Sequence, residues 1–381
     1  MPLGVAVLGS TGSIGRSALA VLRRHPDQFR VVALAAHRNE SALCRQMAEW
    51  HPDVAVLVDG SAAASDANLQ RGPDALLAAA RHPAADIVIN AVVGAAGLQA
   101  TLAALLAGKR LALANKESLV AGGQLVLAAL REGHGELVPI DSEHSAILQC
   151  LNAGSGRHLR RVILTASGGP FREHPVAALA AVTPEQALRH PTWDMGAKIT
   201  IDSATLANKA LEVIEGHFLF GIDYDSIDVV VHPQSIIHSM VELIDGSVLA
   251  QLGFPNMELP ILYALTSPNR LLDQGIRSFD PVAAAALTFQ PVDGVRFPAF
   301  QLGIDAGRAG GTATAVYNAA NEVAVARFLR HEIGFTAIPQ VIEAVLSAHR
   351  KEDADSLDKV LDADHWAREA AAAVPATRPA R

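Results

Sequence analysis

Residues 4–15 read GVAVLGSTGSIG, a short apolar run followed at once by a turn that contains Gly9, Gly12 and Gly15. Glycines in such a turn let the backbone approach a ligand closely, and the next helix offers its N-terminal amides to a pyrophosphate. The spacing is G-x-x-G-x-x-G instead of the usual G-x-G-x-x-G, so the loop alone is a weak signal. A plain tight turn is the alternative.

The first third of the chain repeats this unit of an apolar run and a helix. Strands are expected at 4–8, 30–35, 54–58, 86–93, 110–114 and 136–140, and helices at 17–24, 40–50, 73–81, 98–107 and 118–131. Such alternation is typical of a parallel sheet that is covered on both faces. The right-handed crossover rule then predicts a doubly wound sheet with a crevice at the carboxyl ends of its strands. In this context we favour dinucleotide binding.

The rhythm changes after residue 140. Strands are expected at 161–166, 198–202 and 228–232, a hairpin at 236–251 around Asp245-Gly246, and helices at 312–330, 338–350 and 356–373. The fold class that we predict is therefore α/β with three domains. They are a doubly wound domain at 1–140, an α+β domain at 141–272 and, after a linker at 273–297, a C-terminal helical domain at 298–381.

The composition argues against several classes of protein. The 381 residues carry 31 basic and 39 acidic side chains without a basic block, which disfavours a nucleic-acid or anionic-membrane partner. Cys44 and Cys150 are the only cysteines, so neither a disulfide framework nor a thiolate metal cluster is expected. The uncharged run 87–108 could span a bilayer, but its Asn and Gly residues fit a buried strand, a turn and a helix better. No signal peptide is evident, and we expect a cytoplasmic protein.

The end of the second strand bears on the choice of cofactor. It reads Ala35-Ala36-His37-Arg38-Asn39 and has no acid that would bind the ribose 2′-hydroxyl of NAD. Arg38 could instead pair with a 2′-phosphate, which favours NADP. A solvated arginine is the alternative.

Two polar turns follow later strands of the predicted sheet. Asn115-Lys116-Glu117-Ser118 could contact a ligand at the crevice or simply cap a helix. In Asp141-Ser142-Glu143-His144, strand alternation would place both carboxylates on one side, where a divalent cation would relieve their repulsion. A polar strand end that faces water is the alternative.

A third carboxylate lies on a helix that we expect to start at Asp202. Thr205, Asn208, Lys209 and Glu212 are spaced i, i+3, i+4 and i+7 and would share one face. A hydroxyl, an amide, an ammonium and a carboxylate together suit a phosphorylated substrate beside a metal. A solvated polar face is the alternative.

Two loops complete the candidate site. Residues 165–170, TASGGP, offer a serine and exposed amides as a phosphate nest. Residues 190–196, HPTWDMG, could form a lid or a packed surface loop. His232 and His238 lack acids or thiolates at metal-ligand spacing, so we expect them to be structural.

Seven ordered segments together resemble the 1-deoxy-D-xylulose 5-phosphate reductoisomerase family over nearly the whole chain. They are GSTGSIG (9–15), ALANKESLV (112–120), PIDSEHSAI (139–147), TASGGPF (165–171), HPTWDMGAKITIDSATLANKALEVIE (190–215), HPQSIIHSMV (232–241) and NAANEVAVA (318–326). The resemblance implies isomerisation of 1-deoxy-D-xylulose 5-phosphate and its reduction by NADPH to 2-C-methyl-D-erythritol 4-phosphate, a step of non-mevalonate isoprenoid biosynthesis. It also implies that the domain at 1–140 is an NADP-binding domain and that the domain at 141–272 is catalytic and connective. A homodimer is implied as well, with a dimerisation sheet in this second domain.

The resemblance also implies a role for individual residues. Contacts to NADPH would come from Thr11, Gly12, Ser13, Ile14, His37, Arg38, Asn39, Asn115, Glu117 and Gly196, and His37 stands where the family often has Gly. Mg²⁺, Mn²⁺ or Co²⁺ would be held by Asp141, Glu143 and Glu212, which with Lys116 form the catalytic set. The substrate would be bound by Lys116, Ser142, Glu143, Ser167, His190, Trp193, Ser203, Asn208, Lys209 and Glu212. Within this set, the phosphate would be held by Ser167, Ser203, Asn208 and Lys209, with His190 nearby.

Two other interpretations of the sequence are possible. Another NADP-dependent dehydrogenase, homoserine-dehydrogenase-like, would share the domain plan but would not need three convergent acids. A dinucleotide-binding module without catalysis could keep residues 9–15 but would have no use for Lys209, Glu212 and the Trp193 loop together.

Overall fold

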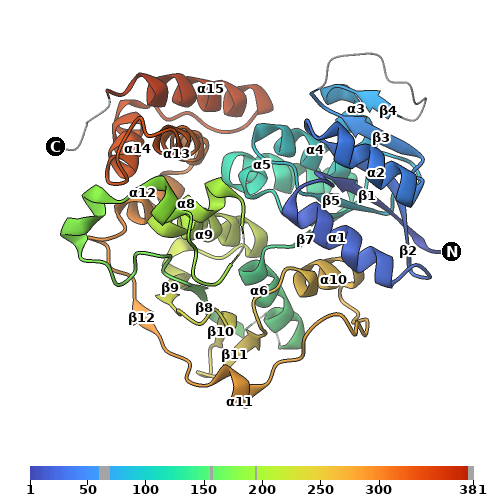
Figure 1. Cartoon of the computed structure of the whole chain (residues 1–381), viewed down its shortest axis with the longest axis horizontal. Helices are drawn as coiled ribbons and strands as arrows, with labels where there is room; N and C mark the ends of the chain where they lie inside the picture. The colour runs from blue at the N-terminus through green and yellow to red at the C-terminus, as the bar shows by residue number, and fades with distance from the viewer. Residues whose placement is uncertain (60–68, 155–157, 194, 376–381) are drawn as a thin grey trace. The chain divides into compact units, whose positions relative to one another are not determined.

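The computed structural model describes residues 1–59, 69–154, 158–193 and 195–375 (Figure 1). These residues form two compact units. Unit 1 comprises 1–118, 125–145 and 256–277, and unit 2 comprises 119–124, 146–255 and 278–381. Among the described helices, none has both the length and the apolar character that crossing a bilayer requires. The domain boundaries at 140, 272 and 297 stay a prediction.

Unit 1 is built on a parallel sheet. Within the described residues it has seven strands in the order β4-β3-β2-β1-β5-β6-β7. The strands are β1 (Leu3–Leu8), β2 (Phe29–Ala36), β3 (Val54–Leu57), β4 (Leu69–Arg71), β5 (Ile87–Asn90), β6 (Arg110–Leu113) and β7 (Glu136–Pro139). The helices that belong to it are α1 (Ser13–Arg24), α2 (Glu40–Trp50), α3 (Pro73–Ala80), α4 (Ala95–Leu106), most of α5 (Lys116–Gly133) and α10 (Glu258–Thr266).

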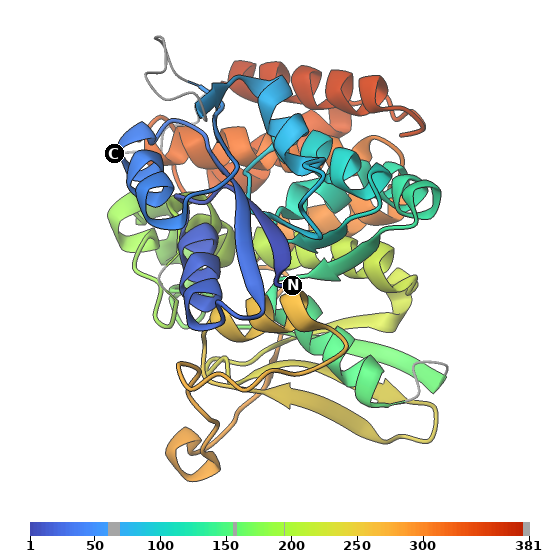
Figure 2. The same ribbon diagram turned by 90° about the vertical axis from the view of Figure 1, so that its right-hand side faces the viewer.

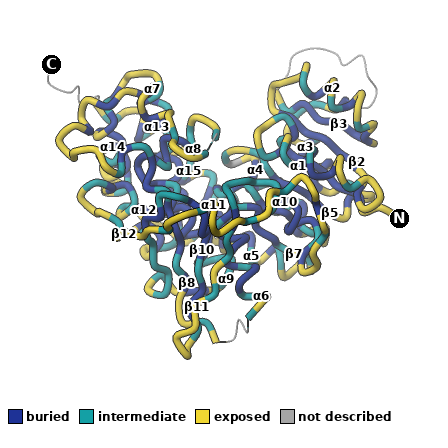
Figure 3. Tube along the Cα trace, turned by 60° about the horizontal axis from the view of Figure 1, so that its bottom comes forward, coloured by how far each residue is buried: buried dark blue, intermediate teal, exposed yellow. Residues whose placement is uncertain are grey.

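The predicted doubly wound fold is confirmed by this sheet. Its central strands are buried along almost their whole length, as continuous apolar runs require (Figure 3). The strand order reverses between β1 and β5, which places a topological switch point at the carboxyl end of β1. Ligands of such folds bind in the crevice at that point. The short strand β4 was not predicted.

Residues 256–277 also belong to unit 1, although they are far from its other residues in the sequence. Two arginines of unit 1 form hydrogen bonds with this segment. Arg24 donates hydrogen bonds of 2.8 Å to both carboxylate oxygens of Asp273, whose side chain is fully buried. Arg110 donates to the carbonyl oxygen of Leu265 at 3.0 Å. These contacts attach residues 256–277, including α10, to the rest of unit 1.

Unit 2 contains a mixed sheet and a helical layer. Its described strands run in the order β11-β10-β8-β9-β12, namely β8 (Leu159–Ala166), β9 (Ile227–Val231), β10 (Ile237–Leu243), β11 (Val248–Leu252) and β12 (Gln290–Pro291). The predicted hairpin is confirmed: β10 and β11 pair antiparallel and turn at Gly246, whose φ is +85° (Figure 2). Its helices are α7 (Pro184–Ala187), α8 (Ala197–Thr205), α9 (Ala207–Phe220), α11 (Pro281–Ala284), α12 (Pro298–Ala309), α13 (Ala313–Leu329), α14 (Ala337–Ala348) and α15 (Leu357–Ala373), with α6 (Ser142–Ala153) leading into it.

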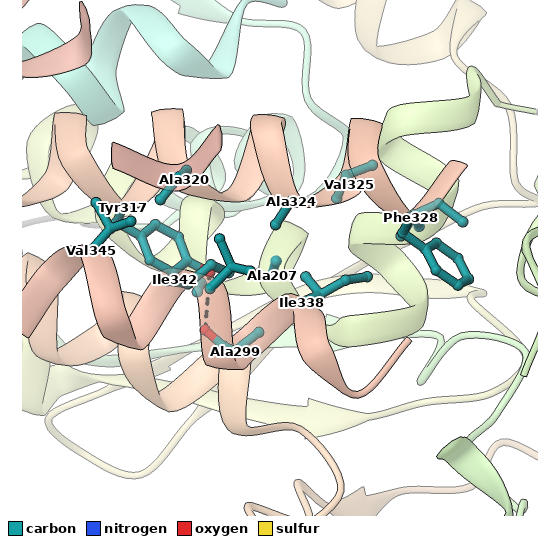
Figure 4. Packing of buried hydrophobic residues seen from close by; sticks show 14 of the residues in the cluster. Ala207, Ala299, Tyr317, Ala320, Ala324, Val325, Phe328, Ile338, Ile342 and Val345 are labelled. Carbon is teal, nitrogen blue, oxygen red and sulfur yellow. Dashed lines mark hydrogen bonds between the residues drawn. The ribbon is translucent and has the colours of Figure 1, made fainter. Parts of the chain in front are cut away.

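The helical layer packs around α13, which is buried on nearly every side (Figure 4). Tyr317 is fully buried, and its hydroxyl donates a 3.0 Å hydrogen bond to the carbonyl oxygen of Ala299 on α12. Phe328, Ile338 and Ile342 fill the space between α13 and α14. The three helices predicted at the end of the chain are therefore confirmed, and they share one core with α8, α9 and α12.

Three expectations about residues 198–212 are wrong. Residues 198–202 were expected to form a strand, but they lie in α8, where Lys198 and Asp202 form an i, i+4 ion pair of 2.8 Å. Asp202 therefore lies inside a helix and does not begin one. Leu206, with φ +56°, separates α8 from α9, so Thr205 does not share a helical face with Asn208 and Glu212.

Candidate active site

The glycine loop after β1 fits a pyrophosphate. A Cβ atom on Gly9 would lie 2.4 Å from the carbonyl oxygen of Ala91, and one on Gly15 would lie 2.3 Å from that of Gly9. Gly12 is the N-cap of α1, and no described side chain caps this helix end. Its first amides therefore remain available to a ligand. Thr11, Ser13 and Ile14, all exposed or half-buried, lie in the same turn.

The polar residues from which a preference for NADP was predicted lie at the end of β2. His37, Arg38 and Asn39 are all exposed. The Arg38 Nε atom donates to Asp59, which follows β3, at 2.6 Å, and Asn39 caps α2. An exposed ion pair of this kind contributes at most about 1 kcal/mol. Arg38 can therefore exchange its partner for a ligand phosphate at little cost.

Asn115 forms the N-cap of α5, which was the alternative left open for this turn. Its Oδ1 accepts from the backbone N–H of Ser118 at 3.0 Å. Its Nδ2 donates to the carbonyl oxygen of Val92 at 2.7 Å and to the Glu117 carboxylate at 2.6 Å. Asn115 and Glu117 are buried, so a role in cofactor contact stays a prediction.

Asp141 and Glu143 lie at the start of a helix and not on a strand, which corrects the sequence-based expectation. The Asp141 Oδ1 accepts from the backbone N–H groups of Glu143 at 3.1 Å and His144 at 3.2 Å, and so caps α6. This cap ends the extended chain after β7 and starts the helix. An oxygen of the Asp141 carboxylate nevertheless lies within 4.8 Å of one of Glu143.

Two basic side chains and a hydroxyl lie next to these two carboxylates. Lys116 forms an ion pair with Asp141, and the Nδ1 atom of His144 lies 3.2 Å from the same carboxylate. Ser142 donates to the Glu143 carboxylate at 2.7 Å. Paired carboxylate oxygens are the ligands that Mg²⁺ and Mn²⁺ prefer. The donor set in unit 1 therefore fits the expected metal.

In unit 2, the loop after β8 brings two serines together. Gly169 has φ +66°, and a Cβ atom there would lie 2.6 Å from the carbonyl oxygen of Ser203. Only glycine allows this close approach, which leaves the hydroxyls of Ser167 and Ser203 3.5 Å apart. The Nε2 atom of His190 lies 3.0 Å from Ser167 Oγ and 3.1 Å from Ser203 Oγ. Three of the predicted phosphate-binding residues thus meet.

The hydrogen bonds of His190 fix its tautomer. Its Nδ1 accepts from the backbone N–H groups of Thr192 at 3.1 Å and Trp193 at 2.9 Å, so the proton of the neutral ring is on Nε2. Burial, and then the charge of Arg172, lower the pKa of His190 to about 4. Near neutral pH the ring is an uncharged donor directed at the serine hydroxyls.

The expected lid is described only in part, because Asp194 lies outside the described residues. Trp193 is half-buried, and its ring centroid lies 6.3 Å from that of His238. Gly196 is the N-cap of α8. His232 is structural as predicted, because its Nδ1 contacts the carbonyl oxygen of Thr288 at 2.9 Å while Nε2 accepts two backbone N–H groups.

The first turns of α9 bring together the remaining predicted residues of unit 2. Lys209 and Glu212 are 4% and 1% exposed and form an ion pair, and Asn208 donates to the same carboxylate. Buried charges require such partners, since removing one would leave the other uncompensated. The sequence motifs did not point to Arg172 or His144. His144 follows Asp141 by one helical turn, and Arg172 directly follows the segment TASGGPF (165–171).

Comparison with known proteins identifies the family. Three family models match, described as DXP reductoisomerase, over residues 5–123, and as its C-terminal domains, over residues 137–220 and 252–370. The 1-deoxy-D-xylulose 5-phosphate reductoisomerase of Aromatoleum aromaticum is 52% identical, covering 96% of this chain and 94% of its own. That of Prosthecochloris aestuarii is 50% identical, covering 97% and 99%. The chain belongs to the 1-deoxy-D-xylulose 5-phosphate reductoisomerase family.

Solved structures agree with this assignment. The reductoisomerase of Zymomonas mobilis in complex with NADPH matches with a TM-score of 0.91 and 44% identity, covering 98% of this chain and 99% of its own. A reductoisomerase in complex with NADPH, fosmidomycin and magnesium matches with a TM-score of 0.90 and 37% identity, covering 97% and 98%. The expected fold class and reductoisomerase activity are confirmed. The homoserine-dehydrogenase-like alternative is not supported.

Proposed function

We propose that this reductoisomerase holds a divalent cation with the carboxylates of Asp141, Glu143 and Glu212. The observation that carries the proposal is the approach of the Asp141 and Glu143 carboxylate oxygens to within 4.8 Å of each other at the start of α6. Glu212 supports it because a buried carboxylate on α9 is the third acid of the family motif. A related reductoisomerase binds magnesium together with fosmidomycin.

When bound, the cation polarises the substrate ketone for rearrangement, and NADPH supplies the hydride that reduces the resulting aldehyde. The chain contributes orientation and charge. Lys116 lies against Asp141, and Lys209 lies against Glu212. In this proposal each ammonium would donate to substrate oxygens bound near these carboxylates. Ser142, whose hydroxyl donates to Glu143, would contact the substrate in the same way.

The phosphate of 1-deoxy-D-xylulose 5-phosphate would bind in unit 2. Ser167, Ser203 and the Nε2–H of His190 form a cluster of donors, and Asn208 and Lys209 complete the predicted set. Trp193 would cover the bound substrate and exclude water. Phosphate contacts remote from the reacting carbons supply orientation, which lowers the barrier without taking part in the bond changes.

NADPH would bind in unit 1 at the switch point of the sheet. Thr11, Gly12, Ser13 and Ile14 would contact the pyrophosphate, and Arg38 would contact the 2′-phosphate. His37, Asn39, Asn115, Glu117 and Gly196 are the remaining contacts that we propose. We further propose that the protein acts as a cytoplasmic homodimer, with no nucleic-acid partner.

The variant Glu212→Gln tests the metal set directly. It keeps the size of the side chain but removes one charge, so turnover should fall steeply while NADPH affinity stays near that of the wild type. Calorimetric titration with Mn²⁺ in the presence of fosmidomycin should give weaker binding for the variant. Glu343→Gln, which changes an exposed acid on α14, is the matched control. Near-normal turnover of Glu212→Gln would remove Glu212 from the metal set.

A further inference from the structure

Arg172 lies against the serine loop without having been assigned to it. A Cβ atom on Gly168 would lie 3.0 Å from the Cβ and 3.3 Å from the Cδ of Arg172. The arginine stem thus passes over the residue next to Ser167, in the space that a side chain at position 168 would occupy. This places the start of the guanidinium-bearing chain beside the cluster of Ser167, His190 and Ser203.

The backbone on both sides of Arg172 is anchored. Phe171 is 3% exposed and packs edge-to-face on Phe335, with ring centroids 5.2 Å apart. Arg296 donates to the carbonyl oxygen of Phe171 at 3.0 Å and also to that of His174. Arg172 is therefore presented by a fixed segment, as a residue that positions a ligand should be.

The charge of Arg172 is poorly compensated within the described residues. Its Nε atom is buried and makes no hydrogen bond there, and its ion-pair contact is with Glu173 at 3.5 Å. The Glu173 side chain is 80% exposed, so solvent screens it strongly. The positive charge also reaches the ring of His190, whose pKa it lowers together with burial.

The other groups proposed for the phosphate leave it short of positive charge. A sugar phosphate is close to a dianion near pH 7. His190 is neutral at that pH, the serines and Asn208 carry no charge, and Lys209 is paired with Glu212. Lys209 alone would not match the charge of a dianion, so a second cation would bind the phosphate more strongly.

We propose that Arg172 is that cation, a further substrate-binding residue whose guanidinium positions the phosphate group of the substrate against Ser167, Ser203 and His190. This inference rests on the proposed function. It explains why an arginine with a buried Nε, on a backbone that is anchored on both sides, lies over a glycine turn.

The experiment compares Arg172→Gln and Arg172→Lys with the wild type, using fosmidomycin and 1-deoxy-D-xylulose 5-phosphate as ligands. Arg172→Gln should weaken fosmidomycin binding and raise KM by roughly 10- to 100-fold, as expected for loss of a charge-assisted contact. Arg172→Lys should recover part of the affinity, and NADPH affinity should not change in either variant. Arg189→Gln, which removes the exposed cation next to His190 in sequence, is the matched control and should have little effect.

A second readout separates charge from structure. The pKa of His190, measured by NMR on the protein without substrate, should rise in Arg172→Gln and stay low in Arg172→Lys. Wild-type protein that binds no fosmidomycin would contradict the proposed function itself. Wild-type protein that binds it, together with an Arg172→Gln variant of equal affinity or an equal loss in Arg189→Gln, would overturn the role of Arg172 alone.

Discussion

The backbone N–H of Trp193 donates a 2.9 Å hydrogen bond to the Nδ1 atom of His190. The same imidazole contacts the hydroxyls of Ser167 and Ser203 through Nε2. One ring therefore connects the start of the 190–196 loop to the proposed phosphate site. A change in the hydrogen bonds at Nδ1 of His190 should therefore alter its contacts with the two serines at Nε2.

The first prediction concerns the pH dependence of stability. The pKa of His190 is about 4 in the folded protein against 6.5 for the free side chain, because burial and then Arg172 disfavour the charged ring. The stability that comes from keeping it neutral is complete above pH 6.5 and is lost as the pH falls toward 4. As the pH falls from 6.5 to 4, the free energy of unfolding should decrease less for His190→Gln than for the wild type. The difference between the two decreases should be about 3 kcal/mol at most.

Urea unfolding at several pH values measures this difference. His365→Gln, which changes an exposed histidine on α15, is the control and should follow the wild type. Parallel pH profiles for wild type and His190→Gln would contradict the neutral, half-buried assignment of His190.

The second prediction concerns the serine loop. Gly169→Ala should destabilise unit 2 and disrupt phosphate binding, because its Cβ would lie 2.6 Å from the Ser203 carbonyl oxygen at φ +66°. Gly221→Ala has a similar φ of +62° but meets no atom within 4 Å, so it carries only the conformational cost of about 1–2 kcal/mol. Denaturant unfolding of both variants isolates the clash. Equal destabilisation would show that the close approach at Gly169 is not required.

The third prediction concerns Trp193. If it covers bound substrate, then fosmidomycin should change its fluorescence and protect the chain near residue 193 from proteolysis. The variant Trp50→Phe/Trp366→Phe leaves Trp193 as the remaining tryptophan and makes the signal specific. If Trp193→Ala turned over substrate at the wild-type rate, the loop would not act as a lid and would be a packed surface loop.

The fourth prediction concerns Arg38 and cofactor choice. Arg38→Ala should weaken the binding of NADPH by about 1.5–3 kcal/mol and the binding of NADH much less, because only NADPH has the 2′-phosphate. Asp59→Asn removes the competing partner of Arg38, so it should leave NADPH binding intact or tighten it slightly at low salt. Fluorescence titration of both cofactors measures these affinities. Equal affinity of the wild type for NADPH and NADH would contradict the role of Arg38.

The alternation of strands and helices in unit 1 could be predicted because each buried strand is a continuous apolar run that periodicity reveals. The segment 198–202, KITID, contains the β-branched residues of a strand, yet it is helical. Its helix is supported by partners that sequence does not reveal, such as the 2.8 Å hydrogen bond from Asn321 to Asp202. Local propensity was overridden by tertiary contacts.

Sequence could name most candidate site residues but not their partners. That Asp141 caps α6, that Lys116 pairs with it, and that Leu206 breaks the helix at a left-handed φ are consequences of the folded chain. The spacing of a motif shows which side chains are present. It does not show the hydrogen bonds that fix the tautomer of His190, or that Nε of Arg172 makes no hydrogen bond within the described residues.

A single assay can show whether this chain reduces a sugar phosphate only when a metal ion is bound. NADPH oxidation is followed with 1-deoxy-D-xylulose 5-phosphate after treatment with excess chelator, and again after Mn²⁺ is returned. The carboxylates of Asp141, Glu143 and Glu212 predict that oxidation stops with chelator and resumes with Mn²⁺. Undiminished oxidation in excess chelator would contradict the claim.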